Sequence, residues 1–252
     1  MTSLESSPSR EGMNVGLYTA LVHAQVMSVR GEKERAYDTH PDTSLYWCFV
    51  DLVDSSNYRI TRGPKAGYVR SETFFALIRS VISYCPDVRL IKEIGDSTFI
   101  AGEFRDILEC LIIIDHEAFQ LRQLTGDDEY PFAIRGGIGY GPAKRLVRPS
   151  DDFIGSSIDQ LARLMGERNP SYNLFIHANA YDPMEQVVGE YADFLKVHPA
   201  EQLSPQASKG MKKPVYYHWL DVNRPVLAEF GACFSSWRNA VGRQQRTAGQ
   251  EE

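Results

Sequence analysis

The possible fold of this chain is constrained most by two apolar, strand-like runs, each of which ends in an aspartate beside turn-forming residues. The first run is FVDLVDSS at 49–56 and the second is KEIGD at 92–96, which places Asp51 and Asp96 45 positions apart. Gly95 suits a tight hairpin turn, because glycine reaches the positive φ values that such turns require. If the two strands are neighbours, the carboxylates lie together, and a pair of cations held there activates a hydroxyl and neutralises a triphosphate.

The spacing of apolar residues predicts an α+β fold around these runs. Strand, helix, strand, strand, helix, strand is the order of a ferredoxin-like βαββαβ core, with a mostly antiparallel sheet and helices on one face. In that arrangement the hairpin 88–101 lies beside 46–53 and brings the two aspartates together. The expected strands are 46–53, 88–94, 97–101, 132–140, 174–176, 191–197 and 215–220. The expected helices are 71–84 with Ser71 as N-cap, 106–124, the part of 151–168 that follows a turn at Gly155, and 178–186. A loop is expected at 57–70.

The bulk properties favour one cytoplasmic domain. Residues 1–40 are expected to be a partly disordered extension with weak helical signals at 14–38, and residues 41–222 the folded domain. Residues 223–252 are expected to be a C-terminal tail, of which about the last fifteen residues are polar and loose. The net charge of -6 argues against a nucleic-acid surface. The longest apolar stretch, 107–114, is too short to span a membrane. The four cysteines are widely spaced, as in a reduced cytosolic protein.

Five separated motifs, in order, resemble the catalytic domain of the class III nucleotidyl cyclases from about residue 44 to about residue 222. They are FVDLVDSS at 49–56, KEIGD at 92–96, IRGGIGYGPA at 134–143, DFIGSSIDQLARL at 152–164 and SKGMKKPVYYHWL at 208–220. The resemblance implies that Asp51, Asp96 and the backbone carbonyl of Leu52 bind two divalent cations, Mn2+ or Mg2+. One cation lowers the pKa of the ribose 3′-hydroxyl and the other clamps the β- and γ-phosphates, and the hydroxyl attacks the α-phosphorus in line.

The resemblance also implies which residues hold the nucleotide. We expect the backbone amides of the turn at Val53, Asp54, Ser55 and Ser56 to cradle phosphate oxygens. Arg163 matches the arginine that stabilises the transition state. Asp159 stands one helical turn earlier, where the family has an asparagine that orients the ribose, so the chain departs from the family pattern there.

Lys92 and Asp152 match the two positions that read the base. A lysine donor and a carboxylate acceptor suit adenine, cytosine and uracil alike, so this pair does not choose among them. From the residues alone, each has a plainer interpretation: Lys92 as a surface strand residue, Asp152 as the cap of the following helix, and Arg163 as a solvated helix residue.

The run at 54–58 lacks the glycine and threonine usual in the family. We also expect a stand-alone catalytic domain without a receptor, membrane or sensory module. In both respects it resembles the bacterial pyrimidine cyclases of the Pycsar anti-phage systems. That resemblance implies conversion of UTP, or next CTP, to a cyclic nucleotide that switches on a companion effector. The alternatives are an adenylate cyclase, a catalytically silent cyclase-like module, and a diguanylate synthase, which the absence of an acid after Gly136-Gly137 disfavours. Because the family builds each site from two chains, we expect a symmetric homodimer with composite active sites.

Overall fold

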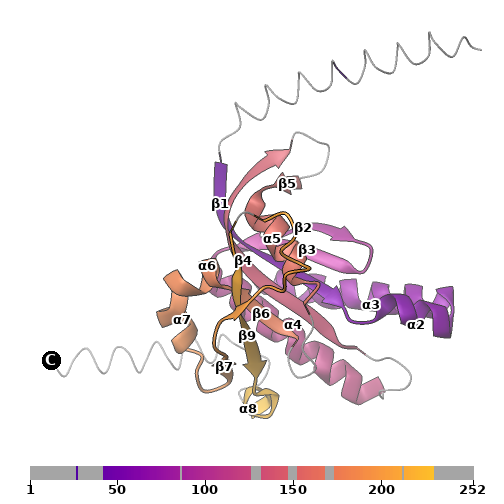
Figure 1. Cartoon of the computed structure of the whole chain (residues 1–252). Coiled ribbons are helices and arrows are strands. Elements are labelled where there is room, and N and C mark those ends of the chain that lie inside the picture. The colour runs from indigo at the N-terminus through magenta and orange to yellow at the C-terminus, as the bar shows by residue number, and fades with distance from the viewer. Residues whose placement is uncertain are drawn as a thin grey trace, which may run out of the picture.

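One nine-stranded sheet organises the structure, a computed structural model that describes residues 27, 42–85, 87–125, 132–146, 152–167, 173–211 and 213–229 (Figure 1). The strand order is β2-β3-β1-β4-β6-β9-β7, with β5 paired to β4 and β8 paired to β9. Every pairing is antiparallel except that of β4 with β6. The strands are β1 (Asp42–Leu52), β2 (Val88–Ile94), β3 (Ser97–Gly102), β4 (Ile134–Leu146), β5 (Asp152–Ile154), β6 (Leu174–His177), β7 (Leu195–Val197), β8 (Glu201–Gln202) and β9 (Tyr216–Val222).

The helices cover both faces of this sheet. They are α2 (Ser55–Arg62), α3 (Pro64–Ser83), α4 (Phe104–Thr125), α5 (Ser156–Leu164), α6 (Ala178–Tyr181), α7 (Glu185–Gly189) and α8 (Arg224–Glu229), with a 3₁₀ turn at Asp182–Met184. In Figure 1, α2 and α3 extend toward the right of the molecule, and α6 and α7 lie on the left. The α+β class and the mostly antiparallel sheet are confirmed.

The larger core lies between the sheet and α3 and α4. Alternate residues of β1, such as Cys48 and Val50, face this side and pack with Phe74 of α3 and Leu111 of α4. The spacing of apolar residues along both helices produces this packing, because each helix presents one apolar stripe to the sheet. The described residues of this core are less than a tenth exposed.

A second core on the opposite face corrects the expectation that helices cover one face only. The other alternate residues of β1, including Trp47, face α5 and pack against Leu161 and Phe153. The rings of Trp47 and Phe99 stack 5.6 Å apart, and those of Phe49 and Phe99 stack 4.6 Å apart. Asp51 continues this side of β1, since strand side chains alternate between faces. The α5 face of the sheet therefore carries the first predicted site residue.

Two glycines of the IRGGIGYG motif permit close packing on both faces of β4. A Cβ on Gly136 would lie 2.4 Å from a methyl carbon of Leu111, and a Cβ on Gly137 would lie 2.0 Å from the ring of Phe175. Phe175 is fully buried. The motif is thus explained by helix and strand packing around β4.

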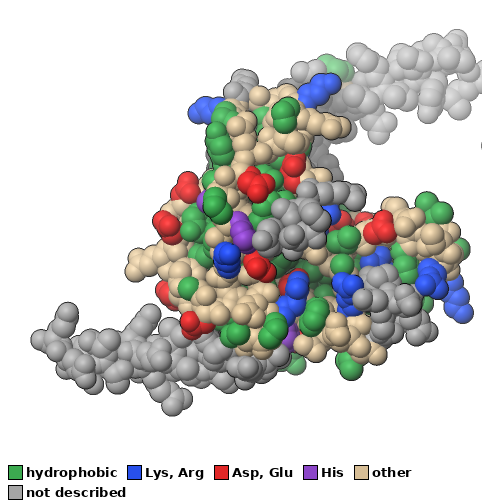
Figure 2. All heavy atoms as spheres, turned by 60° about the horizontal axis from the view of Figure 1, so that its bottom comes forward, with side chains coloured by type: hydrophobic (Ala, Val, Ile, Leu, Met, Phe, Trp, Pro, Cys, Tyr) green, Lys and Arg blue, Asp and Glu red, His purple; other side chains and the backbone are tan. Residues whose placement is uncertain are grey.

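The segment expected as a loop at 57–70 is helical, and Ser71 lies inside α3 rather than at its start. Gly63, with φ of 87°, only breaks the helix, and Pro64 begins the next one at a position where its missing N–H costs nothing. Figure 2 shows several Lys and Arg side chains on the right, the side on which α2 and α3 lie, together with some Asp and Glu side chains, and further Asp and Glu side chains on the left. None of the described helices has the length and apolar character needed to cross a membrane.

Three smaller expectations need correction or lie outside the described residues. Residues 191–194 form turns, so the strand expected at 191–197 is reduced to β7. The tail expected from residue 223 begins with α8, which is anchored to α4 by Arg224. Of the N-terminal extension only Met27 is described, so the expectations for 1–12 and for most of 14–38 stay predictions.

Candidate active site

The structure places Asp51 and Asp96 side by side at one end of the sheet. Asp51 lies opposite Ser97 in the register of β1 and β3, and Asp96 is the second residue of the Gly95-Asp96 turn that joins β2 to β3. Gly95 has φ of 65°, as the turn requires. The N–H of Leu52 donates to the carbonyl of Asp96 at 3.2 Å, which ties the turn to β1.

A serine holds each of these carboxylates. The Oγ of Ser97 donates to Oδ1 of Asp51 at 2.6 Å, and the Oγ of Ser55, which begins α2, donates to Oδ2 of Asp96. Such bonds fix the rotamers of the aspartates and leave the remaining oxygens available to other ligands. Ser55 was predicted to contribute only its backbone amide, and Ser97 was not among the predicted site residues.

The surroundings of Asp51 favour its neutral form. Burial raises the pKa of Asp51, and the charge of Asp96 raises it further, while the Ser97 hydrogen bond and Arg135 lower it. A cation placed beside Asp51 and Asp96 would offset the repulsion that the ionised Asp51 meets there.

Carboxylate oxygens are the ligands that Mg2+ and Mn2+ prefer. Among the described residues there is no group of three or more His, Cys, Asp and Glu that would hold a metal without outside ligands. A hard cation that keeps only one or two carboxylates and takes its other ligands from water and phosphate suits this donor set. Asp51 and Asp96 therefore fit the expected cations, provided that a phosphate ligand completes the coordination.

The turn after β1 supplies fewer amides than expected. The N–H of Val53 donates to the carbonyl of Ala133 at 2.9 Å, so pairing with the segment before β4 has already used it. Asp54 adopts a left-handed conformation with φ of 59° and accepts a bond from the Asn57 amide at 3.0 Å. Ser55 and Ser56 are the first two residues of α2, where backbone N–H groups have no partner within the helix. The pairing with Ala133 thus removes the Val53 amide from the expected phosphate cradle, while the amides at the helix start stay predicted donors.

A buried arginine that the sequence analysis did not identify lies behind the turn. Arg70 of α3 is 2% exposed, and its Nη2 donates to the carbonyl of Val53 at 2.8 Å. Its guanidinium stacks on the ring of Tyr58 at 4.8 Å from the centroid. The expectation of a loop up to residue 70 concealed it, because burial of a helical arginine cannot be read from a segment assumed to be a loop.

Arg135 is a second basic residue that the sequence analysis did not single out. It lies opposite Asp51 in the register of β1 and β4, and its Nη1 donates to the carbonyl of Met165 at 2.8 Å. Met165 directly follows α5. Arg135 therefore links the neighbourhood of Asp51 to the helix that carries Asp159 and Arg163.

Asp159 and Arg163 line a separate cavity of about 550 Å³. The cavity lies between α5, the start of α6 and the segment that leads into β9, and neither Asp51 nor Asp96 lines it. The Nη1 of Arg163 donates to the carbonyls of Ala207 at 3.0 Å and Lys209 at 2.6 Å. The structure thus brings Asp159 and Arg163 together, as their helical spacing predicts, but away from the paired carboxylates.

His177 is a further residue of this cavity, and the sequence analysis gave it no role. Its Nδ1 accepts the N–H of Asn179 at 3.0 Å and so caps α6, while its buried Nε2 has no hydrogen-bond partner among the described residues. Burial lowers the pKa of His177 to about 4, with Asp182 opposing this shift. A neutral histidine whose Nδ1 accepts carries its proton on Nε2.

Lys92 and Asp152, the two residues expected to contact the base, lie on β2 and β5. Lys92 lies on β2 opposite Phe99, half-buried and outside the Arg163 cavity. Asp152 begins β5 and pairs with Leu146 of β4. It does not cap α5, whose N-cap is Gly155, so the plainer interpretation of Asp152 is wrong. The side chain of Asp152 lies outside what the structure describes, and its role stays a prediction.

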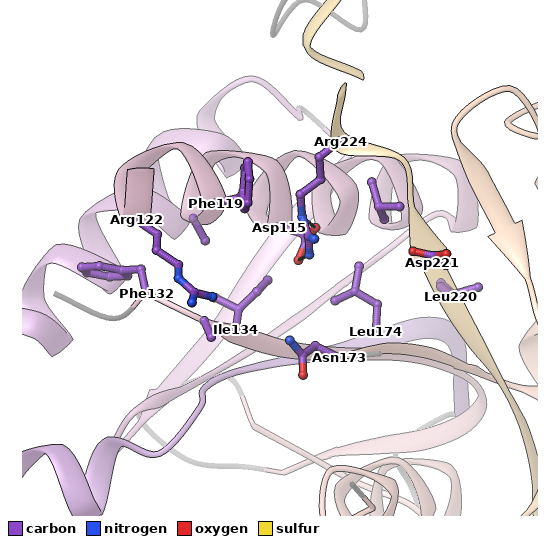
Figure 3. A pocket seen from close by; sticks show the side chains of 13 residues that line it. Asp115, Phe119, Arg122, Phe132, Ile134, Asn173, Leu174, Leu220, Asp221 and Arg224 are labelled. Carbon is purple, nitrogen blue, oxygen red and sulfur yellow. Dashed lines mark hydrogen bonds and ion pairs between the residues drawn. The ribbon is translucent and has the colours of Figure 1, made fainter. Parts of the chain in front are cut away.

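A smaller cavity of about 140 Å³ lies between α4 and the ends of β4, β6 and β9. Figure 3 shows Asp115 and Arg224 meeting beside α4, while Arg122 and Asn173 extend between α4 and the sheet. Arg224 grips Asp115 through two bonds of 2.9 and 3.0 Å. None of the predicted site residues lines this cavity, and its main polar contact joins α8 to α4.

Comparison with known proteins identifies the fold. No family model matches the chain, and no curated protein matches its sequence. Among solved structures, the guanylyl cyclase Cya2 aligns with a TM-score of 0.60 at 15% identity, over 73% of this chain and 94% of that chain. The adenylyl cyclase CyaB from P. aeruginosa aligns with a TM-score of 0.59 at 14% identity, over 71% and 94%. The guanylate cyclase domain of RhGC from Catenaria anguillulae, in complex with GTP, aligns with a TM-score of 0.55 at 12% identity, over 71% and 96%. The chain thus has the fold of the cyclase catalytic domains.

Proposed function

We propose that this protein is a nucleotidyl cyclase, which converts a nucleoside triphosphate to its 3′,5′-cyclic nucleotide and pyrophosphate. The observation that carries the proposal is the pair of serine-held carboxylates of Asp51 and Asp96 at one end of a cyclase-type sheet. Divalent cations bound there would supply the charge that lowers the pKa of the attacking hydroxyl and neutralises the phosphates.

The protein's own residues bind and orient the substrate. Ser97 and Ser55 hold the carboxylates in place, and the backbone amides at the start of α2 face phosphate oxygens. Arg163 contributes a charged donor for the oxygens of the transferring phosphoryl group. In the proposed complex, phosphate oxygens replace the carbonyls of Ala207 and Lys209 as its acceptors.

The proposed site is composite, formed by two copies of the chain. Support comes from the separation within one chain: Asp51 and Asp96 do not line the cavity that Asp159 and Arg163 line. A two-fold dimer that sets the carboxylates of one protomer against the cavity of its partner contains two complete sites. Lys92 and Asp152 would then join the arginine's half of the site and contact the base.

The proposed substrate is a pyrimidine triphosphate, with UTP before CTP, and the proposed product is a messenger for an anti-phage effector. The unusual run Asp54-Ser55-Ser56-Asn57-Tyr58 supports this choice. An adenylate cyclase is the second candidate, and CyaB, an adenylyl cyclase, supports it equally through the shared fold. A silent module is the third candidate, favoured by Asp159 in place of asparagine and by the existing carbonyl partners of Arg163.

One experiment separates these candidates. Purified protein is incubated with each of the four triphosphates and Mn2+, pyrophosphate release is measured, and the product mass is determined. A cyclic pyrimidine product supports the full proposal, and cyclic AMP supports the second candidate. Absence of turnover with all four triphosphates would favour the silent module.

A further inference from the structure

Arg70 occupies a place that packing alone would give to an apolar residue. It lies one helical turn before Phe74, on the stripe of α3 that also buries Phe75, Ile78 and Val81. A guanidinium on such a stripe loses its hydration, which is costly unless opposite charges lie close by. Arg70 is nevertheless 2% exposed. The carbonyl of Val53 and the ring of Tyr58 contact the guanidinium at this buried position.

Hydrogen bonds connect Arg70 to the chain segments that carry Asp51 and Asp96. Its Nη2 bonds the carbonyl of Val53, two residues beyond Asp51. The preceding residue, Leu52, bonds the carbonyl of Asp96, whose carboxylate is held by Ser55 just after the same turn. Burial lowers the pKa of Arg70, whereas Tyr58 and the carboxylates of Asp54, Asp96 and Asp51 raise it. The hydrogen bond to Val53 thus ties the guanidinium to the turn that directly follows Asp51 and that Leu52 joins to Asp96.

We infer that Arg70 is a built-in counter-cation of the metal site, a positioning residue that holds the β1–α2 turn and balances the charges of Asp51 and Asp96 when no divalent cation is bound. The inference rests on the proposed role of these aspartates as metal ligands. It assigns Arg70 two linked effects. The guanidinium stabilises the metal-free site, and it repels each incoming cation, so that the site binds divalent cations more weakly than the two carboxylates alone would.

A change of Arg70 to an uncharged residue tests whether its charge stabilises the metal-free protein and weakens the binding of divalent cations. In Arg70→Gln the carboxylates lack their counter-charge, so the metal-free protein melts at a lower temperature. Added Mn2+ then recovers more stability than in the wild type, and half of the shift is reached at about tenfold lower Mn2+. Arg70→Lys keeps the charge and should respond to Mn2+ like the wild type. Arg79→Gln is the matched control, because Arg79 is also on α3 but is exposed and contacts Glu93.

The measurement is the melting temperature of the full chain against Mn2+ concentration, without nucleotide, and pyrophosphate release from the preferred triphosphate alongside it. A Mn2+ shift in Arg70→Gln that is equal to or smaller than that of the wild type would overturn the inference. If Arg70→Gln does not fold, the double variant Arg70→Gln/Asp96→Asn decides. Recovery of a folded protein supports the counter-charge role, and continued unfolding overturns it. A wild type that turns over no triphosphate, yet shows the expected differences in Mn2+ response, contradicts the proposed function and leaves the inference standing.

Discussion

The hydroxyl of Ser97 donates a 2.6 Å hydrogen bond to Oδ1 of Asp51, its cross-strand partner in the register of β1 and β3. This bond orients one of the two proposed metal ligands and opposes the effect of burial on its pKa. It also shows why the strand register matters here. A shift of one residue between β1 and β3 would turn the serine to the other face.

Replacement of Ser97 by alanine should weaken metal use without unfolding the protein. The pKa of Asp51 rises further when the bond is lost, and the ionised carboxylate is the form that binds a cation. The acid limb of the pH–activity profile therefore moves to higher pH, and the Mn2+ concentration for half-maximal rate increases about tenfold. The control is Ser83→Ala, since Ser83 is exposed on α3 and bonds only a backbone carbonyl. An unchanged acid limb in Ser97→Ala would contradict the assignment.

Mixing two inactive variants tests the composite site. Asp51→Ala and Arg163→Ala should each lack activity, because each dimer then has a defect in both sites. In an equal mixture about half of the dimers are mixed, and each mixed dimer keeps one intact site, so we expect about a quarter of the wild-type rate. The double variant Asp51→Ala/Arg163→Ala mixed with either single variant is the control and should stay inactive. Heterodimers that form without any recovery of pyrophosphate release would refute the shared site.

The apolar runs of the sequence predicted that the β2–β3 hairpin lies beside β1, as it does in the β2-β3-β1-β4 part of the sheet. The pairing of Asp51 with Asp96 followed, because each aspartate stands at the end of such a run. The sequence did not predict α2 and the first turns of α3, since Gly63 and Pro64 suggested a loop where they only separate two helices. Arg70 was missed with them. Ser97 and Arg135 were missed for another reason: their value lies in pairing with Asp51, and cross-strand pairs become visible only when the register is known.

Gly137 should not tolerate a methyl group. A Cβ there would lie 2.0 Å from the buried ring of Phe175, which has no room to move, so Gly137→Ala should lower the free energy of unfolding by about 2 kcal/mol. Gly189 of α7 is the control, because a Cβ there meets nothing within 4 Å. Gly189→Ala should leave stability unchanged or raise it by about 0.5 kcal/mol. Urea denaturation measures both, and equal effects of the two changes would contradict the packing argument.

Loss of the Arg224 side chain should destabilise the fold more than loss of an exposed arginine. Arg224→Ala leaves the carboxylate of Asp115, which is 4% exposed, buried without its partner. We expect a loss of about 3 kcal/mol in the free energy of unfolding. Arg79→Ala breaks an exposed pair with Glu93 and should cost less than about 1 kcal/mol. Equal losses for the two variants in urea denaturation would show that the contact between α8 and α4 contributes little.

Because of His177, the free energy of unfolding should decrease as the pH is lowered. Burial lowers its pKa to about 4 in the folded protein, whereas an unfolded histidine titrates near its ordinary value of about 6.5. The unfolded chain therefore binds the proton first, and the contribution of the neutral buried ring is complete above about pH 6.5 and is lost as the pH falls toward 4, for a total of about 3 kcal/mol. His177→Asn keeps a side-chain acceptor for the N–H of Asn179 and removes the titration, since asparagine is a good N-cap. Urea midpoints at several pH values should then decline less steeply below pH 6.5 in the variant than in the wild type, and identical slopes would mean that other groups cause the acid sensitivity.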